Sequence, residues 1–122
     1  LQHTTDTFFA RKYWELYMSQ AVVVSPGGVG TCDEIFEQLT LQQCKKAPTL
    51  PVVFVGADFW RKSLGFEHMA GQNVMTQAEI DAMCFTDSPE EGRDFIVANL
   101  KARLAAQREK ARKVSPKRER EE

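Results

Sequence analysis

The 122-residue sequence lacks the features that would place it in a membrane or in a secreted, disulfide-rich protein. No apolar run approaches the roughly 18 residues that a membrane-spanning helix needs, and residues 1–6 lack the basic and then apolar pattern of a signal peptide. Three cysteines, an odd number at distant positions, argue against a disulfide framework and against a cysteine-rich metal site. We therefore expect a cytoplasmic protein that makes no contact with a membrane.

The sequence also lacks the motifs of several enzyme classes. It contains no Gly-Lys-Ser/Thr ending of a P-loop, no G-x-G-x-x-G dinucleotide fingerprint and no G-x-S-x-G nucleophile elbow. The two histidines, His3 and His68, are isolated, which leaves no evident nucleophile–base pair or zinc cluster. We expect neither a metal nor a cofactor.

Charge is unevenly distributed along the chain. Residues 1–100 hold 7 Lys/Arg against 13 Asp/Glu, whereas residues 101–122 hold 9 against 4. A basic tail can contact nucleic acid, but here glutamates are interleaved, aromatics are missing and Ser115-Pro116 interrupts the run. We therefore predict a domain over residues 1–106, a charged tail over 107–122 that frays or is disordered, and no nucleic-acid partner.

The most informative stretch is an apolar run that is followed by a glycine loop and then by an amphipathic segment. Residues 21–25 contain three consecutive β-branched, apolar residues, Val22, Val23 and Val24, as in a buried parallel strand. Gly27, Gly28 and Gly30 allow an anion to approach the backbone closely, and the N-terminus of a following helix points its N–H groups at the same spot. This pattern predicts a strand, a phosphate-binding turn and a helix.

Two interpretations of the start of that helix remain open. Thr31 and Glu34 have the T-x-x-E spacing of a capping box, in which each side chain bonds a backbone N–H of the first turn. Alternatively, Thr31 contacts a phosphate and Glu34 lies beside a sugar.

Strands alternate with helices along the chain, which predicts an α/β fold with a parallel sheet and flanking helices in three layers. The expected elements are helix 6–18, strand 21–25, helix 31–44, strand 50–55, helix 58–66, a short helix capped by Thr76 and Glu79, strand 82–86, and a helix opened by Ser88-Pro89. Doubly wound sheets normally have five or six strands. With about three, the chain is expected to be the C-terminal half of such a domain.

Three features together suit the cleavage of a glycosidic bond. They are a carboxylate near the start of a helix, a loop predicted to bind phosphate, and the upstream pair Arg11-Lys12. Cleavage of a glycosidic bond in a nucleoside monophosphate passes through an oxocarbenium-like state, which a nearby carboxylate stabilises while it orients water. A guanidinium stays charged and can fix that carboxylate.

Two motifs resemble the Lonely Guy family, also labelled "lysine decarboxylase-like". Residues 26–34 match its P-G-G-x-G-T-x-x-E signature, and Arg11-Lys12 stand where the family has an Arg-Lys pair. The resemblance, over about residues 5–100, implies a Rossmann-like fold in a homodimer or larger oligomer. It also implies hydrolysis of nucleoside 5′-monophosphates such as AMP to free base and ribose 5-phosphate. It implies catalysis by Arg11 and Glu34, with substrate or phosphate held by Lys12, Gly27, Gly28, Gly30 and Thr31.

Two departures from the family pattern bear on specificity and completeness. Phe8-Phe9-Ala10 replaces the Met-His that often precedes the Arg-Lys pair, which weakens an assignment to cytokinin riboside 5′-monophosphates. The family's N-terminal half is absent from these residues. A noncatalytic nucleotide-binding or cofactor-carrying module of the same fold is the alternative. The decarboxylase label itself has no support, because nothing here resembles a pyridoxal-phosphate site.

Overall fold

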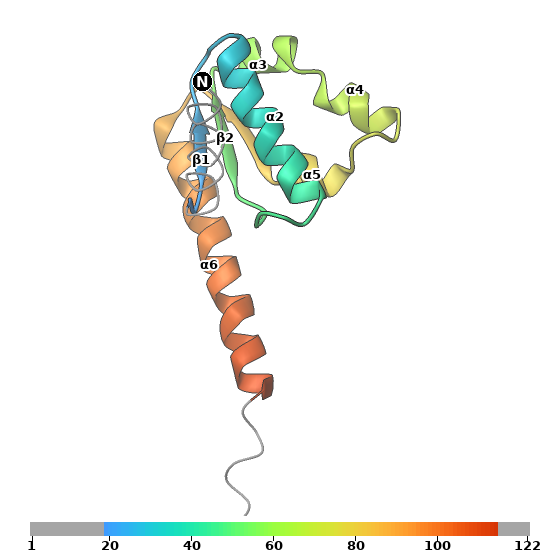
Figure 1. The fold of residues 1–122 in the computed structure, drawn as a ribbon. Coiled ribbons are helices and arrows are strands. Elements are labelled where there is room, and N and C mark those ends of the chain that lie inside the picture. Colours follow the sequence, from blue (N-terminus) through green and yellow to red (C-terminus); the bar gives the residue numbers. More distant parts are fainter. Residues whose placement is uncertain (1–18, 115–122) are drawn as a thin grey trace, which may run out of the picture.

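The computed structural model describes residues 19–114, which form a three-stranded parallel sheet flanked by helices (Figure 1). The elements are β1 (Val22–Val24), α2 (Val29–Gln43), β2 (Val52–Val55), α3 (Ala57–Ser63), α4 (Phe66–Gly71), α5 (Gln77–Asp81), β3 (Met83–Thr86) and α6 (Pro89–Val114). This arrangement confirms the predicted α/β class with a Rossmann-like parallel sheet. The predicted helix 6–18 lies outside the described residues.

The strands pair in the order β1-β2-β3, each parallel to the next. Val22 of β1 is opposite Val52 of β2, which in turn is opposite Met83 of β3. Within the part of the chain that the structure describes, β1 has a partner on one side only, and Val23 of this edge strand is 60% exposed. An open edge offers unpaired backbone groups to a further strand.

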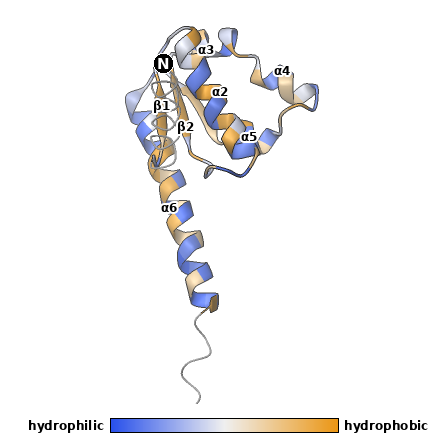
Figure 2. Cartoon of the chain, viewed as in Figure 1, coloured by the Kyte–Doolittle hydropathy of each residue, from blue (hydrophilic) through white to orange (hydrophobic). Residues whose placement is uncertain are grey.

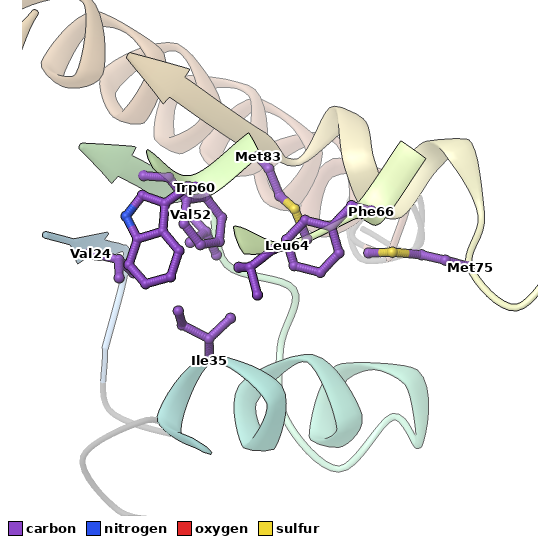
Figure 3. Packing of buried hydrophobic residues seen from close by; sticks show 9 residues of the cluster. Val24, Ile35, Val52, Trp60, Leu64, Phe66, Met75 and Met83 are labelled. Carbon is purple, nitrogen blue, oxygen red and sulfur yellow. The ribbon is translucent and has the colours of Figure 1, made fainter. Parts of the chain in front are cut away.

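Alternate residues of β2 face two different helical layers. Val52 and Phe54 face the main apolar cluster, which also includes Ile35 of α2 and Trp60 of α3 (Figure 3). Val53 faces the other way and meets α6, where a Cβ on Gly92 would lie only 2.9 Å from Val53 Cγ1. The central strand is therefore buried on both faces, as expected for a parallel sheet between helices.

Aromatic rings fill the core beside β2. The Phe54 ring stacks on Phe85 with centroids 4.8 Å apart and meets Trp60 edge-on at 5.5 Å. Phe66, the first residue of α4, packs 6.0 Å from Phe54.

The expected helix 58–66 is wrong in extent, because Leu64 adopts an extended backbone and separates α3 from α4. Phe59 contacts Trp60, with ring centroids 4.9 Å apart, and is 42% exposed.

The start of α6 has the predicted caps. The Glu91 N–H donates to Ser88 Oγ at 3.3 Å, and Pro89 is the first helical residue, where its missing N–H costs nothing. The helix continues past residue 106 to Val114 and extends away from the sheet (Figure 1). Its distal turns are mostly hydrophilic (Figure 2). The proposed domain boundary at residue 106 stays a prediction.

Candidate functional site

The candidate site lies where β1 ends and α2 begins. Gly28 is the N-cap of α2, and its carbonyl accepts the first helical hydrogen bond from the Cys32 N–H at 3.0 Å. Val29, Gly30 and Thr31 are thus the first three helical residues, whose N–H groups have no partner within the helix. No side chain caps this end of α2. The backbone at the glycine loop is consequently available to an anion.

Thr31 does not form the capping box that was one of the two interpretations. It is the third residue of α2 rather than its N-cap, because the helix begins at Val29, two residues earlier than expected. Glu34 is correspondingly the sixth residue, outside the first turn. The capping interpretation of both side chains is wrong, which leaves them available for other contacts.

A cavity of about 270 Å³ lies between β1 and α2. Its lining residues come from β1 and the loop after it, from one face of α2, and from β2: Val22, Val23, Val24, Ser25, Pro26, Thr31, Glu34, Ile35, Gln38, Leu39 and Val52. The volume is close to the lower end, about 300 Å³, of small-molecule sites. Polar groups gather near the loop, and the walls farther along α2 are mostly apolar.

Thr31 and Glu34 reach this cavity from adjacent turns of α2. Glu34 is exposed, and no hydrogen bond or ion pair among residues 19–114 uses its carboxylate. A carboxylate in the second turn of α2 can act on a substrate whose phosphate lies at the helix N-terminus without first breaking a contact to residues 19–114. The structure thus brings together two of the residues that the sequence analysis selected.

The three loop glycines differ in what surrounds them. A Cβ on Gly27 would overlap Thr31 Oγ1 and lie 2.9 Å from Thr31 Cβ, so a side chain at this position would displace the threonine. Around Gly28 and Gly30 nothing lies within 4 Å of such an atom. Gly27 is required by packing, whereas Gly28 and Gly30 border open space that a ligand group could occupy.

The remaining selected residues, Arg11 and Lys12, lie outside the described residues. Their roles as catalytic and substrate-binding groups stay predictions.

Among residues 19–114 no group of three or more His, Cys, Asp or Glu side chains is placed to hold a metal ion. No helix in the same part of the chain is long and apolar enough to span a membrane.

Gln38, which no sequence motif singled out, lines the cavity one turn beyond Glu34. Its side chain is 2% exposed, and neither Nε2 nor Oε1 has a hydrogen-bond partner. Each unsatisfied buried polar group costs about 1–3 kcal/mol. The sequence signal that could have identified this residue is a glutamine four residues after Glu34, among apolar residues of the helix.

Gly56, which follows β2, also belongs to the frame of the site. It has a left-handed backbone (φ 89°), and a Cβ there would lie 2.9 Å from Pro26 Cγ. At the same edge, Asp87 Oδ1 after β3 accepts a hydrogen bond from the Ala57 N–H at 3.1 Å. The ends of all three strands are thereby tied together, at the edge where parallel sheets bind ligands.

A family model described as "Possible lysine decarboxylase" matches residues 2–95, more than half of the chain. No curated protein matches the sequence.

Proposed function

We propose that this chain, which belongs to the lysine decarboxylase-like or Lonely Guy family, hydrolyses the N-glycosidic bond of nucleoside 5′-monophosphates. The products would be a free base and ribose 5-phosphate, and AMP is the first substrate to test. The observation that carries the proposal is that Thr31 and Glu34, near the uncapped start of α2, line the same cavity.

The phosphate of the substrate would lie at the start of α2. The N–H groups of Val29, Gly30 and Thr31 supply donors, and the positive end of the helix dipole favours the negative charge. The open space beside Gly30 leaves room for phosphate oxygens, and the Thr31 side chain lines the adjacent cavity. This end of the site holds the substrate without taking part in bond cleavage.

Glu34 would act on the ribose. As the C1′–N bond breaks, positive charge develops on the ring, and the carboxylate stabilises it and orients a water molecule. The water oxygen bonds to C1′, and its proton passes to the departing base, which leaves with the electrons of the broken bond. Arg11 would hold the carboxylate, and Lys12 would assist substrate binding, as the family resemblance implies.

The test is incubation of the full chain with AMP, GMP, IMP, CMP, UMP and a cytokinin riboside 5′-monophosphate, with ribose 5-phosphate and free base measured. Equimolar release of both products from at least one nucleotide supports the proposal. Saturable nucleotide binding without base release from any of them would overturn it. Binding unaffected by Glu34→Gln would then favour the alternative, a noncatalytic nucleotide-binding or cofactor-carrying module.

The oligomeric state is a related proposal. The family resemblance implies a homodimer or larger assembly, and the open edge of β1 offers one surface that another strand could cover. Light scattering coupled to size-exclusion chromatography measures the mass directly. A mass of 13.9 kDa throughout a concentration series would contradict self-association.

A further inference from the structure

Gln38 is the described residue whose whole carboxamide is buried without a partner. Its side chain is 2% exposed, and both Nε2 and Oε1 lack hydrogen bonds. Gln42 and Trp60 each have one such nitrogen, Nε2 and Nε1 respectively, and neither residue lines the cavity between β1 and α2. Polar groups inside proteins are nearly always hydrogen-bonded, so a donor and an acceptor both left unpaired need a reason.

The position of Gln38 relative to Glu34 supplies that reason. The two residues are four apart in α2, so they lie on one face of the helix about one turn, or 5.4 Å, from each other. Both line the same cavity, which is polar near Ser25 and Thr31 and has apolar walls where Gln38 lies. A ligand with a polar end at the loop and a flat, mostly apolar end deeper in the cavity matches this distribution.

We infer that Gln38 determines substrate specificity by hydrogen bonding to the polar edge of the base. This inference rests on the proposed function, in which the ribose lies at Glu34 and the base extends along α2. A carboxamide offers one acceptor and two donors in a plane. The edge of a purine offers the complementary pattern, and glutamine is known to pair in this two-bond manner with adenine.

Such recognition depends on the exocyclic group of the base. AMP carries an amino group and IMP an oxo group at C6, and the carboxamide can rotate to suit either. Purine riboside 5′-monophosphate lacks any group there, so on binding it would leave one end of the Gln38 side chain unpaired in a buried place. Sites built around hydrogen bonds reject such analogues strongly, because their own polar groups remain unsatisfied.

The experiment measures equilibrium binding of AMP and of purine riboside 5′-monophosphate to the full chain. Glu34→Gln provides the background, so that neither nucleotide is consumed. We expect at least a tenfold preference for AMP, a ratio near one after Gln38→Leu, and unchanged affinity for ribose 5-phosphate. Gln107→Leu, the same change at an exposed position of α6, should keep the preference. Gln38→Met repeats the test with a flexible side chain of similar length.

The other outcomes separate this inference from the proposed function. An AMP preference that survives Gln38→Leu and Gln38→Met would overturn the inference. A lowered melting temperature with an unchanged ratio of AMP to purine riboside 5′-monophosphate affinity would also overturn it, because that result indicates a purely structural glutamine. Loss of ribose 5-phosphate binding in the same variants would also overturn it. If AMP binds with a Gln38-dependent preference but the wild-type chain releases no base, the inference stands and the hydrolase proposal fails. Absence of binding by AMP and by free adenine overturns the inference.

Discussion

Pro26 packs so closely against Gly56 that a Cβ atom at residue 56 would lie 2.9 Å from Pro26 Cγ. This contact joins the loop after β1 to the turn after β2, and so it fixes the start of the glycine loop against the central strand. Gly56 also has φ 89°, a conformation that side-chain-bearing residues rarely adopt.

Gly56→Ala should therefore destabilise the fold and disturb the loop. The left-handed backbone alone costs about 1–2 kcal/mol for alanine, and displacement of Pro26 adds to this. Urea denaturation measures the change in the free energy of unfolding. Gly71→Ala is the matched control, since a Cβ there meets nothing within 4 Å and φ is not positive. Equal stabilities of the two variants would contradict this role of Gly56.

Gly30→Ala should separate stability from ligand binding. Gly30 is the second residue of α2, its φ is negative and its surroundings are open, so alanine should stabilise the helix by about 0.4–1 kcal/mol. The same methyl group would occupy space that the proposal gives to the phosphate, and ribose 5-phosphate should bind at least tenfold more weakly. Thermal unfolding and calorimetric titration measure the two effects. A variant that binds as the wild type does would place the phosphate elsewhere.

The capping box of α5 predicts a contribution to stability that depends on pH. The Thr76 N–H donates to Glu79 Oε2 at 2.6 Å, and this backbone hydrogen bond holds the pKa of Glu79 below its ordinary value. Because the folded pKa is lower than the unfolded one, the carboxylate stabilises the fold above the unfolded pKa. That contribution is lost as pH falls through the folded pKa.

Glu79→Gln should consequently lose less stability than the wild type between about pH 7 and pH 3, since glutamine can still accept the N–H but does not titrate. Urea denaturation at a series of pH values measures the difference. Glu67→Gln, at an exposed carboxylate in the first turn of α4, serves as control. Identical pH profiles for Glu79→Gln and the wild type would rule out the linkage.

The cysteines should differ in reactivity. Partial burial, and secondarily the negative charge of Glu91, raise the pKa of the Cys84 thiol, whereas Cys44 is exposed after the end of α2. Because the thiolate is the nucleophile, Cys44 should be alkylated first by iodoacetamide in the native protein at about pH 8. Peptide mapping follows each site, and the rates should converge in urea. Faster native labelling of Cys84 would contradict its described environment.

Local sequence signals predicted the strands and several helix ends well. Strands 50–55 and 82–86 were apolar runs between turn residues, and both are present in slightly shorter form as β2 and β3. The Thr76–Glu79 capping box forms as its spacing indicates, with both reciprocal hydrogen bonds. These features depend on residues within a few positions of each other, which is why the sequence alone determines them.

Features that depend on distant contacts were harder to predict. Thr31 and Glu34 have the same spacing as the pair in α5, yet Gly28 caps α2 and the box does not form. Gln38 and Gln43 show the same limit, since both are glutamines of α2, yet Gln43 is exposed and Gln38 is buried beside β1. Only the packing of the helix against the sheet decides which glutamine faces the cavity. Arg11 and Lys12 stay predictions.

The most direct test of the account compares AMP hydrolysis by the wild type, Glu34→Gln and Glu37→Gln, with adenine and ribose 5-phosphate measured together. Glu37 is on the same helix but does not line the cavity, so its variant controls for the loss of a carboxylate from α2. The account predicts equimolar products from the wild type and Glu37→Gln, and a fall in kcat of about 100-fold or more for Glu34→Gln with an unchanged melting temperature. A folded Glu34→Gln variant that hydrolyses AMP at the wild-type rate would contradict it.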